Sequence, residues 1–358
     1  MAIGVVGSRF AANPSRGVFS EEEFGEPMKI IGAECAVAEK IRATTPAVTH
    51  GCAIGVAGAG NSAKLDESKT PTSVTIHLSS GLGNQIFIYS FYRLLQEKLG
   101  NDRAFLRPMA MMSHSAAGHA RPFQLDRFRT KIAYAKKHEQ NSVRLTWPKL
   151  NYGSDEIIGK LFTQQRPYEI VNCFEWVAGL RCLTEIIDML RDEFEPKDQL
   201  GSANEKILER IAAATEPVSV HVRRGDYLVP PYNKWFKTLP VEYYKGAEKF
   251  ICERVENPTF FVFSDDIEWA KKNLKFDYPS VFVDINGEAD GWKDFVLMKN
   301  CRHHITANSS FSTYAAVLAK NPEKIVVSPW KFDGGYDGIF WKECACVCND
   351  GTIAASKS

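Results

Sequence analysis

The sequence carries almost no net charge and has no block of like charges. It contains 44 Lys and Arg residues against 43 Asp and Glu residues, for a formal net charge of +1. This balance creates no overall field that would draw the chain to a nucleic acid. A G-x-x-x-x-G-K-[ST] loop is also absent, so the phosphate chemistry of P-loop proteins is not expected.

The usual signatures of a metal site are missing too. No Asp-X-Asp, the spacing of a metal–nucleotide clamp, occurs in the chain. Nine cysteines, an odd number, indicate reduced thiols in a protein of this size. Cys344, Cys346 and Cys348 alternate with single residues, whereas zinc sites use C-x₂₋₄-C pairs with two further ligands. We therefore expect no metal and no cofactor, and the cysteine alternation favours a strand or a tail.

Membrane and export signals are likewise lacking. No stretch approaches the roughly 20 apolar residues that cross a bilayer. The N-terminus has no charged segment followed by an apolar one. These absences lead us to expect a cytoplasmic protein, with peripheral association with a membrane left open.

What is present suggests two domains with an appendage at each end. A length of 358 residues, with 44% hydrophobic residues, is ample for two domains. Residues 1–72 are rich in Ala, Gly and Ser without a sustained period, which predicts a poorly ordered extension. Within them Gly58–Ala63 matches a dinucleotide fingerprint, but no helix can follow, so we interpret it as a loop. The remaining divisions are a first α/β domain at 73–215, a second, Rossmann-like domain at 216–342 and a tail at 343–358.

The first domain opens with a strand, a glycine loop and a helix. Residues 74–78 alternate between apolar and polar, which predicts a strand. Ser79–Gln85 is expected to be a turn, for which Gly81 and Gly83 supply conformational freedom, and Asn84 lies beside them at the mouth of this domain. Residues 86–99 predict a helix that is apolar on nearly every side and therefore buried. Two further helices are expected at 185–194 and 204–214.

The second domain shows the clearest pattern, strands alternating with helices. The expected strands are 218–222, 259–263, 280–283, 303–306 and 324–327, and the expected helices are 243–255, 267–274, 294–301 and 312–319. This alternation predicts a parallel sheet with helices on both faces. The fold class is thus α/β, with two Rossmann-like domains.

Ligands of an open parallel sheet bind beyond the carboxyl ends of its strands. The residues in those positions are polar and recur after each strand. They are Arg223, Arg224, Gly225 and Asp226, then Asp265 and Asp266, then Asp284 and Asn286, then Asn308, Ser309, Ser310, Phe311 and Ser312. Arginine forks match phosphate oxygens, and a Ser-rich helix start favours an anion. The set predicts a nucleotide diphosphate held without a metal.

Each of these residues also has a plainer interpretation. The arginine turn could form a surface salt bridge, and His221 could be a satisfied core histidine within its strand. The Asp265–Asp266 pair could simply cap the next helix. Asn308 formally opens a glycosylation sequon, a use that we discount because it lies at the expected ligand edge.

Four collinear segments resemble the galactoside α-1,2-fucosyltransferases, glycosyltransferase family eleven. They are Gly81–Gln85, His221–Asp226, Phe261–Asp266 and Ala307–Ser312. The similarity covers about residues 74–332. It implies a GT-B-like architecture and an inverting, metal-independent transfer of fucose from GDP-fucose to a galactose-containing glycan.

The resemblance also implies roles for residues. Arg223 would contact the leaving diphosphate, and His221, Arg224 and Asp226 would shape the same pocket. The guanosine would lie near Asp265 and Asp266, and the phosphates at 309–312, while Asn84 would reach the reacting centre. Family members with an N-terminal anchor work in the Golgi, and no anchor is visible here.

The chain departs from the family after Ser312, where Thr313–Val317 replaces a Trp-rich helix, and at Asn172–Trp176. Three alternatives to the fucosyltransferase interpretation stay open. The chain could transfer another GDP-sugar or use another acceptor. It could bind GDP without turnover. It could also be a carbohydrate-binding module, which would need exposed aromatic platforms in place of an arginine cradle.

Overall fold

The computed structural model describes residues 70–108, 121–136, 141–146, 163–171, 184–230, 232–234, 236–329, 331–332, 336–337 and 344–354. They belong to one compact unit, Leu65–Ser358. The predicted extension at 1–72 lies outside these residues except for its last three, and so do Gly58–Ala63 and Asn172–Trp176. In the described ranges no helix has both the length and the apolar character to cross a membrane.

The first sheet has four parallel strands in the order β2-β1-β4-β3. The strands are β1 (Ser73–Leu78), β2 (Ala104–Pro108), β3 (Val143–Thr146) and β4 (Pro167–Val171). Strand β1 lies inside this sheet, and its predicted apolar residues Val74, Ile76 and Leu78 are completely buried. The prediction of this strand is confirmed, while the other three strands were not predicted.

Helix α2 (Leu82–Leu99) follows β1 and begins four residues earlier than predicted. Gly81 is its extended N-cap, and the Gln85 amide donates to the Gly81 carbonyl at 3.0 Å. Gly83, Asn84 and Gln85 are therefore in the first turn of the helix and not in a separate loop, which corrects the predicted turn. The helix contacts both its own sheet and helix α10 of the second sheet, which explains why it is apolar on nearly every side.

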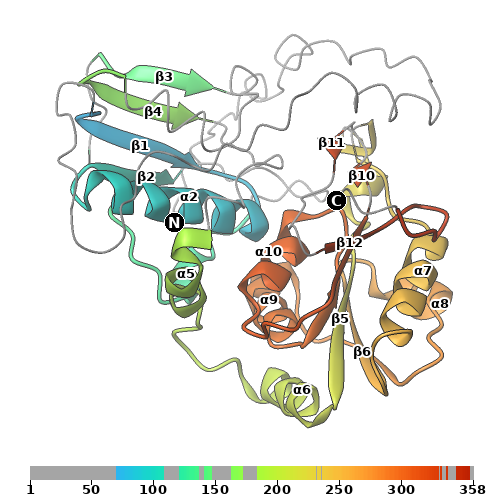
Figure 1. Cartoon of the computed structure of the whole chain (residues 1–358). Helices are drawn as coiled ribbons and strands as arrows, with labels where there is room; N and C mark the ends of the chain where they lie inside the picture. Colours follow the sequence, from blue (N-terminus) through green and yellow to red (C-terminus); the bar gives the residue numbers. More distant parts are fainter. Residues whose placement is uncertain are drawn as a thin grey trace, which may run out of the picture. The chain divides into compact units, whose positions relative to one another are not determined.

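The second sheet consists of six parallel strands in the order β12-β9-β8-β5-β6-β7 (Figure 1). Its strands are β5 (Glu216–Val222), β6 (Pro258–Ser264), β7 (Ser280–Phe282), β8 (His303–Ile305), β9 (Val326–Pro329) and β12 (Cys344–Val347). The helices between them are α7 (Val241–Cys252), α8 (Ile267–Asn273), α9 (Gly291–Lys299) and α10 (Ser310–Leu318). The predicted alternation of strands and helices is confirmed.

The strand order locates the ligand edge of this sheet. From β5 the chain proceeds outward through β6 and β7, then returns to β8 on the other side of β5 and proceeds outward again. The order reverses between β5 and β8, and ligands of doubly wound sheets bind at such a switch point. The residues that follow β5 and β8 are therefore the ones to inspect.

The C-terminal residues correct one predicted boundary. Cys344–Val347, assigned to a tail, form β12 and pair with β9 in parallel register. Val347 is completely buried in the core of the second sheet, so these residues extend that sheet. The short strands β10 (Lys331–Phe332) and β11 (Tyr336–Asp337) form an antiparallel pair. Among the described cysteines, Cys252, Cys301, Cys344 and Cys348 carry free thiols.

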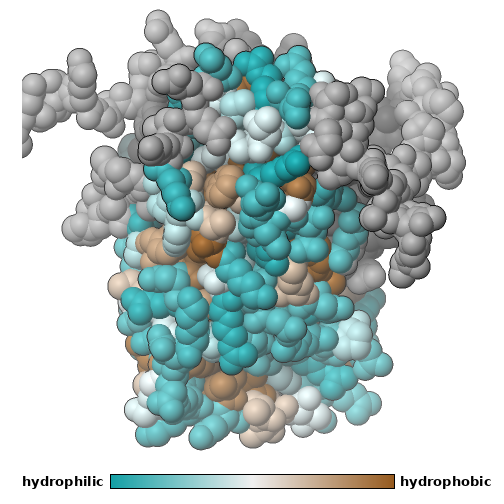
Figure 2. Space-filling view, turned by 90° about the vertical axis from the view of Figure 1, so that its left-hand side faces the viewer, coloured by the Kyte–Doolittle hydropathy of each residue, from teal (hydrophilic) through white to brown (hydrophobic). Residues whose placement is uncertain are grey.

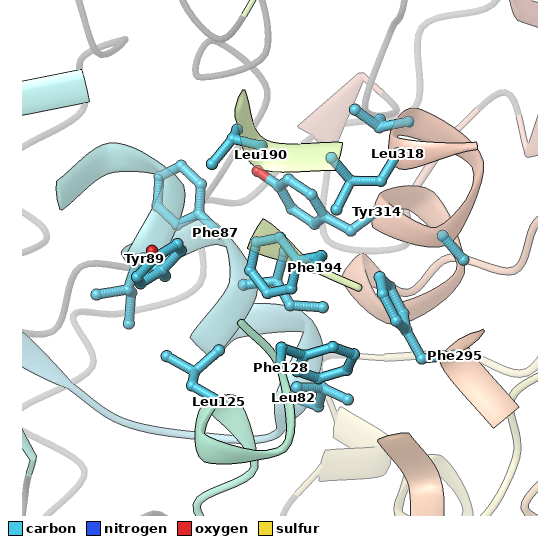
Figure 3. Packing of buried hydrophobic residues seen from close by; sticks show 14 of the residues in the cluster. Leu82, Phe87, Tyr89, Leu125, Phe128, Leu190, Phe194, Phe295, Tyr314 and Leu318 are labelled. Atoms are coloured by element: carbon cyan, nitrogen blue, oxygen red, sulfur yellow. The ribbon is translucent and has the colours of Figure 1, made fainter. Parts of the chain in front are cut away.

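Helices cover both faces of the second sheet, and one face shares its core with the first sheet. On β6, Phe260 and Val262 pack with α7 and α8, whereas Phe261 and Phe263 pack into a cluster with α2, α9 and α10. Aromatic rings from α2, α9, α10 and the segments around Phe128 and Phe194 meet there (Figure 3). Phe128 lies 5.4 Å from Phe194 and 5.8 Å from Phe295 between ring centroids. The two halves thus share one hydrophobic core.

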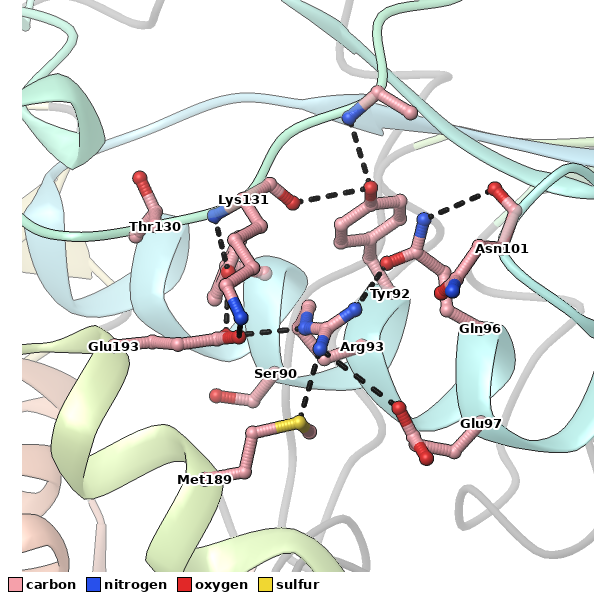
Figure 4. A network of polar contacts seen from close by, with 12 residues as sticks. Ser90, Tyr92, Arg93, Gln96, Glu97, Asn101, Thr130, Lys131, Met189 and Glu193 are labelled. Carbon is pink, nitrogen blue, oxygen red and sulfur yellow. Dashed lines mark hydrogen bonds and ion pairs between the residues drawn. The ribbon is translucent and has the colours of Figure 1, made fainter.

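The segment between the sheets contains 3-10 helix η3 (Thr184–Ile186), α5 (Ile187–Glu193) and α6 (Ser202–Ala213), which confirms the two predicted helices. A buried polar network joins α5 to α2 (Figure 4). Glu193 Oε2 accepts from Tyr89 Oη at 2.6 Å and from Arg93 Nε at 3.0 Å. Because both carboxylate partners come from α2, the network determines how α5 lies along that helix.

Hydrophilic residues predominate on the face that Figure 2 shows, with hydrophobic ones in small groups. The large hydrophobic side chains that are exposed in the described ranges are far apart in the sequence, for example Tyr134, Leu228 and Tyr278. The apolar residues of the described ranges are therefore mainly buried in the hydrophobic cores.

Candidate active site

Arg223 is the first residue beyond β5, at the predicted ligand edge. Its Nη1 donates to Asp265 Oδ2 at 2.7 Å and its Nη2 donates to Asp226 Oδ1 at 2.6 Å. Burial alone would lower the pKa of Arg223, but Asp265 and Asp226 raise it above its ordinary value. A guanidinium has five N–H donors, more than these two carboxylates accept. Arg223 is thus a fixed cation that can still donate to a phosphate oxygen.

Gly225 allows the neighbouring carboxylate to come this close. A Cβ at this position would lie 2.6 Å from Asp265 Oδ2, too close for any side chain. With glycine there, Asp265 also accepts from the Arg224 backbone amide at 2.8 Å. The Arg-Arg-Gly-Asp turn after β5 and the Asp-Asp pair after β6 therefore form one unit, as the sequence predicted.

Arg224 points to a different neighbour than Arg223. Its Nε donates to Asp266 Oδ2 at 3.0 Å, and its guanidinium carbon lies 4.0 Å from the centroid of the Trp269 ring. Asp266 caps α8 by accepting from the Trp269 amide at 3.2 Å. The capping interpretation is thus confirmed for Asp266, whereas Asp265 serves the arginine turn.

The Ser-rich segment after β8 leads into α10 at Ser310. Ser309 is the N-cap, yet no side chain caps this helix. Ser312 is completely buried, where its Oγ accepts from the Ala307 amide at 3.1 Å and donates to the Ser309 carbonyl at 3.3 Å. Ser312 therefore stabilises the loop between β8 and α10, with its hydroxyl turned to backbone groups of that loop.

The start of α2 meets the start of α10. Gly83 permits this approach, because a Cβ there would lie 2.6 Å from Ser310 Oγ and even closer to the Phe311 amide nitrogen. Ser310 Oγ donates to Asn84 Oδ1 at 2.9 Å. Neither N-cap residue makes a side-chain cap hydrogen bond, so two helix starts without such a cap converge. Both carry the positive end of a helix dipole, and together they favour an anion.

His221, the last but one residue of β5, is buried beside this point. Its ring lies 5.4 Å from the Phe311 ring. Burial lowers the pKa of His221 to about 4, an effect that Asp265 opposes and Arg223 strengthens. Within the described residues nothing hydrogen-bonds to its Nδ1. His221 is therefore neutral at neutral pH and is not fully satisfied by the core.

Asp284 and Asn286, which follow β7, are not brought into this cluster. Asp284 pairs with Lys271 at 2.8 Å. Asn286 exchanges hydrogen bonds with Asn204 and donates to Asp294 Oδ1 at 2.7 Å. Asn308 is buried and donates to the Lys237 carbonyl at 2.8 Å, which agrees with discounting the sequon.

Three residues of the site were missed in the sequence, namely Arg121, Tyr227 and Glu288. Arg121 Nη2 donates to Asp226 Oδ2 at 2.8 Å and its Nη1 donates to Glu288 Oε1 at 2.6 Å. Tyr227 Oη donates to the Asn308 carbonyl at 2.9 Å, which joins the loops after β5 and β8. Tyr227 directly follows the arginine turn and could have been noticed. Arg121 lies in a stretch without clear periodicity, where nothing marked it.

The site as a whole pairs three arginines with four carboxylates. The members are Arg121, Arg223 and Arg224, with Asp226, Asp265, Asp266 and Glu288. No group of three or more His, Cys, Asp or Glu residues in the described ranges is arranged to hold a metal ion. The arrangement can receive a doubly charged phosphate group on arginine and helix N–H donors at the switch point.

Comparison with known proteins agrees with this picture. The model of Glycosyl transferase family 11 matches residues 51–334. The chain belongs to this family. Its two parallel sheets with helices agree with the GT-B-like architecture expected of this family.

Individual relatives in family 11 are similar over most of their length. The O-antigen biosynthesis glycosyltransferase WbnK of Escherichia coli is 31% identical over 72% of this chain and 94% of its own. An alpha-1,2-colitosyltransferase of the same organism is 30% identical over 72% of this chain and 91% of its own. Galactoside alpha-(1,2)-fucosyltransferase 1 of Saimiri boliviensis boliviensis is 28% identical over 78% of this chain and 75% of its own.

Proposed function

We propose that this family 11 glycosyltransferase transfers L-fucose from GDP-fucose to a galactoside hydroxyl, with inversion, an α-1,2 linkage and no metal ion. The donor and linkage are supported by the relative that is named a galactoside alpha-(1,2)-fucosyltransferase. The observation that carries the proposal is the convergence of Arg223 with two helix starts at the switch point of the second sheet.

In this proposal the leaving group is the GDP diphosphate. The bond between the anomeric carbon and the β-phosphate oxygen breaks, the oxygen keeps the electron pair, and the sugar becomes oxocarbenium-like. Arg223 and the N–H groups at the start of α10 bind the diphosphate more strongly as its charge grows, which lowers the barrier. Because the carboxylates hold Arg223 in place beforehand, little reorganisation accompanies the reaction.

The acceptor hydroxyl attacks the anomeric carbon from the face opposite the diphosphate, which inverts the configuration. Its proton passes to solvent or to a phosphate oxygen after the new bond forms. Asn84 stands at the α10 start on the side of the first sheet, where it can position the reacting groups. His221 is neutral and buried, so in this scheme it packs against the donor instead of supplying charge.

A second candidate is transfer of a different sugar from a nucleotide donor. It is favoured by the relative named an alpha-1,2-colitosyltransferase, which is 30% identical to this chain. The diphosphate site described above would serve either sugar, because its charged groups contact the shared part of the donor.

Turnover of GDP-fucose with a panel of galactosides tests the proposal. We expect a fucosylated product whose linkage, read by NMR, is α-1,2, and continued turnover in excess EDTA. Competition between GDP-fucose and other GDP-sugars, such as GDP-mannose, in the turnover assay distinguishes the second candidate from the first. Binding of GDP in calorimetry without release of GDP from GDP-fucose, with any acceptor, would show a catalytically silent homologue and contradict the proposal.

A further inference from the structure

Arg121 is the one arginine of the site that comes from the first half of the chain. Its side chain is 16% exposed and joins two carboxylates of the second half, Asp226 at 2.8 Å and Glu288 at 2.6 Å. It belongs to no helix or strand, and a long flexible side chain of this kind loses much conformational freedom when it is ordered. The ordered position of the Arg121 side chain therefore requires a structural explanation.

The backbone beside Arg121 is held by two glutamines. Gln85 Nε2 donates to the Pro122 carbonyl at 2.8 Å, and Gln85 Oε1 accepts from the Gln124 amide at 3.0 Å. Gln124 Nε2 donates to the Ala289 carbonyl at 2.8 Å. These bonds hold the backbone next to Arg121 between the start of α2 and the residue just after Glu288, which limits the positions that the Arg121 side chain can take.

Asp226 is shared by two arginines, one on each oxygen. Oδ1 accepts from Arg223 and Oδ2 accepts from Arg121. Without Arg121, Oδ2 would be buried with no cation beside it, because Asp226 is only 8% exposed. A buried carboxylate that has lost one of its two cations interacts more strongly with the cation that remains, because less positive charge compensates it. That cation is Arg223, so Asp226 would then compete with the diphosphate for the same guanidinium.

We propose that Arg121 is a positioning residue of the donor site: by pairing with Asp226 Oδ2 it leaves the Arg223 fork available to the leaving diphosphate. The inference rests on the proposed function for the identity of the ligand. Under this proposal, the first half of the chain contributes to donor binding indirectly, through the contact of Arg121 with Asp226. A direct contact of Arg121 with phosphate and a purely structural role are the two alternatives.

A double-mutant cycle on GDP affinity separates these three roles. Calorimetry with GDP is carried out on the wild type, Arg121→Met, Asp226→Asn and the double variant. We expect Arg121→Met to weaken GDP binding about tenfold, equivalent to about 1.4 kcal/mol. In the Asp226→Asn background, Arg121→Met should weaken GDP binding by less than about twofold, because the carboxylate through which Arg121 acts is gone.

If Arg121→Met weakened GDP binding equally with Asp and with Asn at position 226, the inference would be overturned in favour of a direct contact between Arg121 and phosphate. An unchanged GDP affinity in folded Arg121→Met would overturn it in favour of a structural role. Melting temperatures monitor folding, and if the Met variant does not fold, Arg121→Lys enters the same cycle, since lysine keeps the charge but cannot reach two carboxylates with one fork. Arg127→Met is the matched control, because Arg127 is half exposed and its ion pair with Asp126 is 3.9 Å long.

Failure of this inference is distinguishable from failure of the proposed function. If the wild type itself does not bind GDP, the donor assignment fails. If it binds GDP and turns over GDP-fucose but the cycle shows no coupling, only the role of Arg121 is wrong.

Discussion

Ser310 Oγ donates a hydrogen bond of 2.9 Å to Asn84 Oδ1, which joins the start of α10 to the start of α2 across 226 positions of the chain. One partner belongs to the half with the first sheet and the other to the loop after β8. The contact places an amide of the first half next to the helix start at which we expect the diphosphate.

Replacing Asn84 tests whether it acts on the reaction or on donor binding. We expect Asn84→Ala to lower kcat by on the order of 10²-fold, because the amide is proposed to position the reacting groups. GDP affinity should stay within about threefold of the wild type, a small change on the free-energy scale. Asn300→Ala, at an exposed asparagine after α9, is the control. A loss of GDP affinity as large as the loss of turnover would make Asn84 a donor ligand instead.

The approach of the two helices depends on Gly83. A methyl group there would meet Ser310 Oγ and the Phe311 backbone, so Gly83→Ala should destabilise the protein by about 1–3 kcal/mol, as overpacking does, and abolish most activity. Gly287→Ala is the matched control, since nothing lies within 4 Å of its Cβ position. Thermal unfolding measures both variants, and equal melting temperatures would contradict the close approach.

Arg223 should matter for turnover far more than for folding. We expect Arg223→Ala to reduce kcat by about 10²–10³-fold with a near-native circular dichroism spectrum, because it removes a donor that strengthens as the diphosphate leaves. Arg223→Lys should recover only part of the loss, since lysine cannot replace the two-pronged geometry. The control is Arg254→Ala, whose side chain is 44% exposed. Near-wild-type turnover of Arg223→Ala would remove this arginine from the mechanism.

The carboxyl of Asp294 should make stability depend on pH. Burial raises its pKa to about 7, which the hydrogen bond from Asn286 opposes and Asp290 reinforces. Between about pH 4, where an unfolded Asp ionises, and pH 7 the folded state holds more protons than the unfolded state. The free energy of unfolding contributed by this group therefore falls as the pH rises through that window.

Asp294→Asn removes this contribution, because an amide does not titrate. The difference in unfolding free energy between the variant and the wild type should grow in favour of the variant from pH 4 to 7 and then level off. Urea unfolding at a series of pH values measures it. Parallel curves for Asp294→Asn and the wild type would mean that the carboxyl is ionised in the folded protein.

The strands of the second sheet and the helices between them could be predicted because the local sequence pattern indicates which of their residues are buried. Thr259–Phe263 is a continuous apolar run, as is typical of a strand covered on both faces. The strands β2, β3 and β4 were missed because they are short and include charged residues such as Arg107, Arg144 and Glu169. Their pairing comes from contacts with distant residues, which a local pattern does not contain.

The residues of the site also divide into those that a local pattern predicts and those that depend on tertiary structure. Arg223, Asp226 and Asp265 could be predicted because each follows a strand directly, and a parallel sheet brings those positions to one edge. Arg121 could not, since its place at Asp226 results from the packing of Gln85 and Gln124 against other parts of the chain. The direction of Arg224 toward Trp269 also depends on tertiary structure alone.

The aromatic cluster between the sheets makes a separation of the two halves of the chain unfavourable. A ring such as Phe128 or Phe295, both fully buried, covers about 150–250 Å², which at about 25 cal/mol per Å² corresponds to ~4–6 kcal/mol on exposure to water. A movement that exposes several such rings to water would be rare. If the proposed donor binds at the β5–β8 edge, it would therefore meet side chains that are already in place, and no closing step would reduce its affinity.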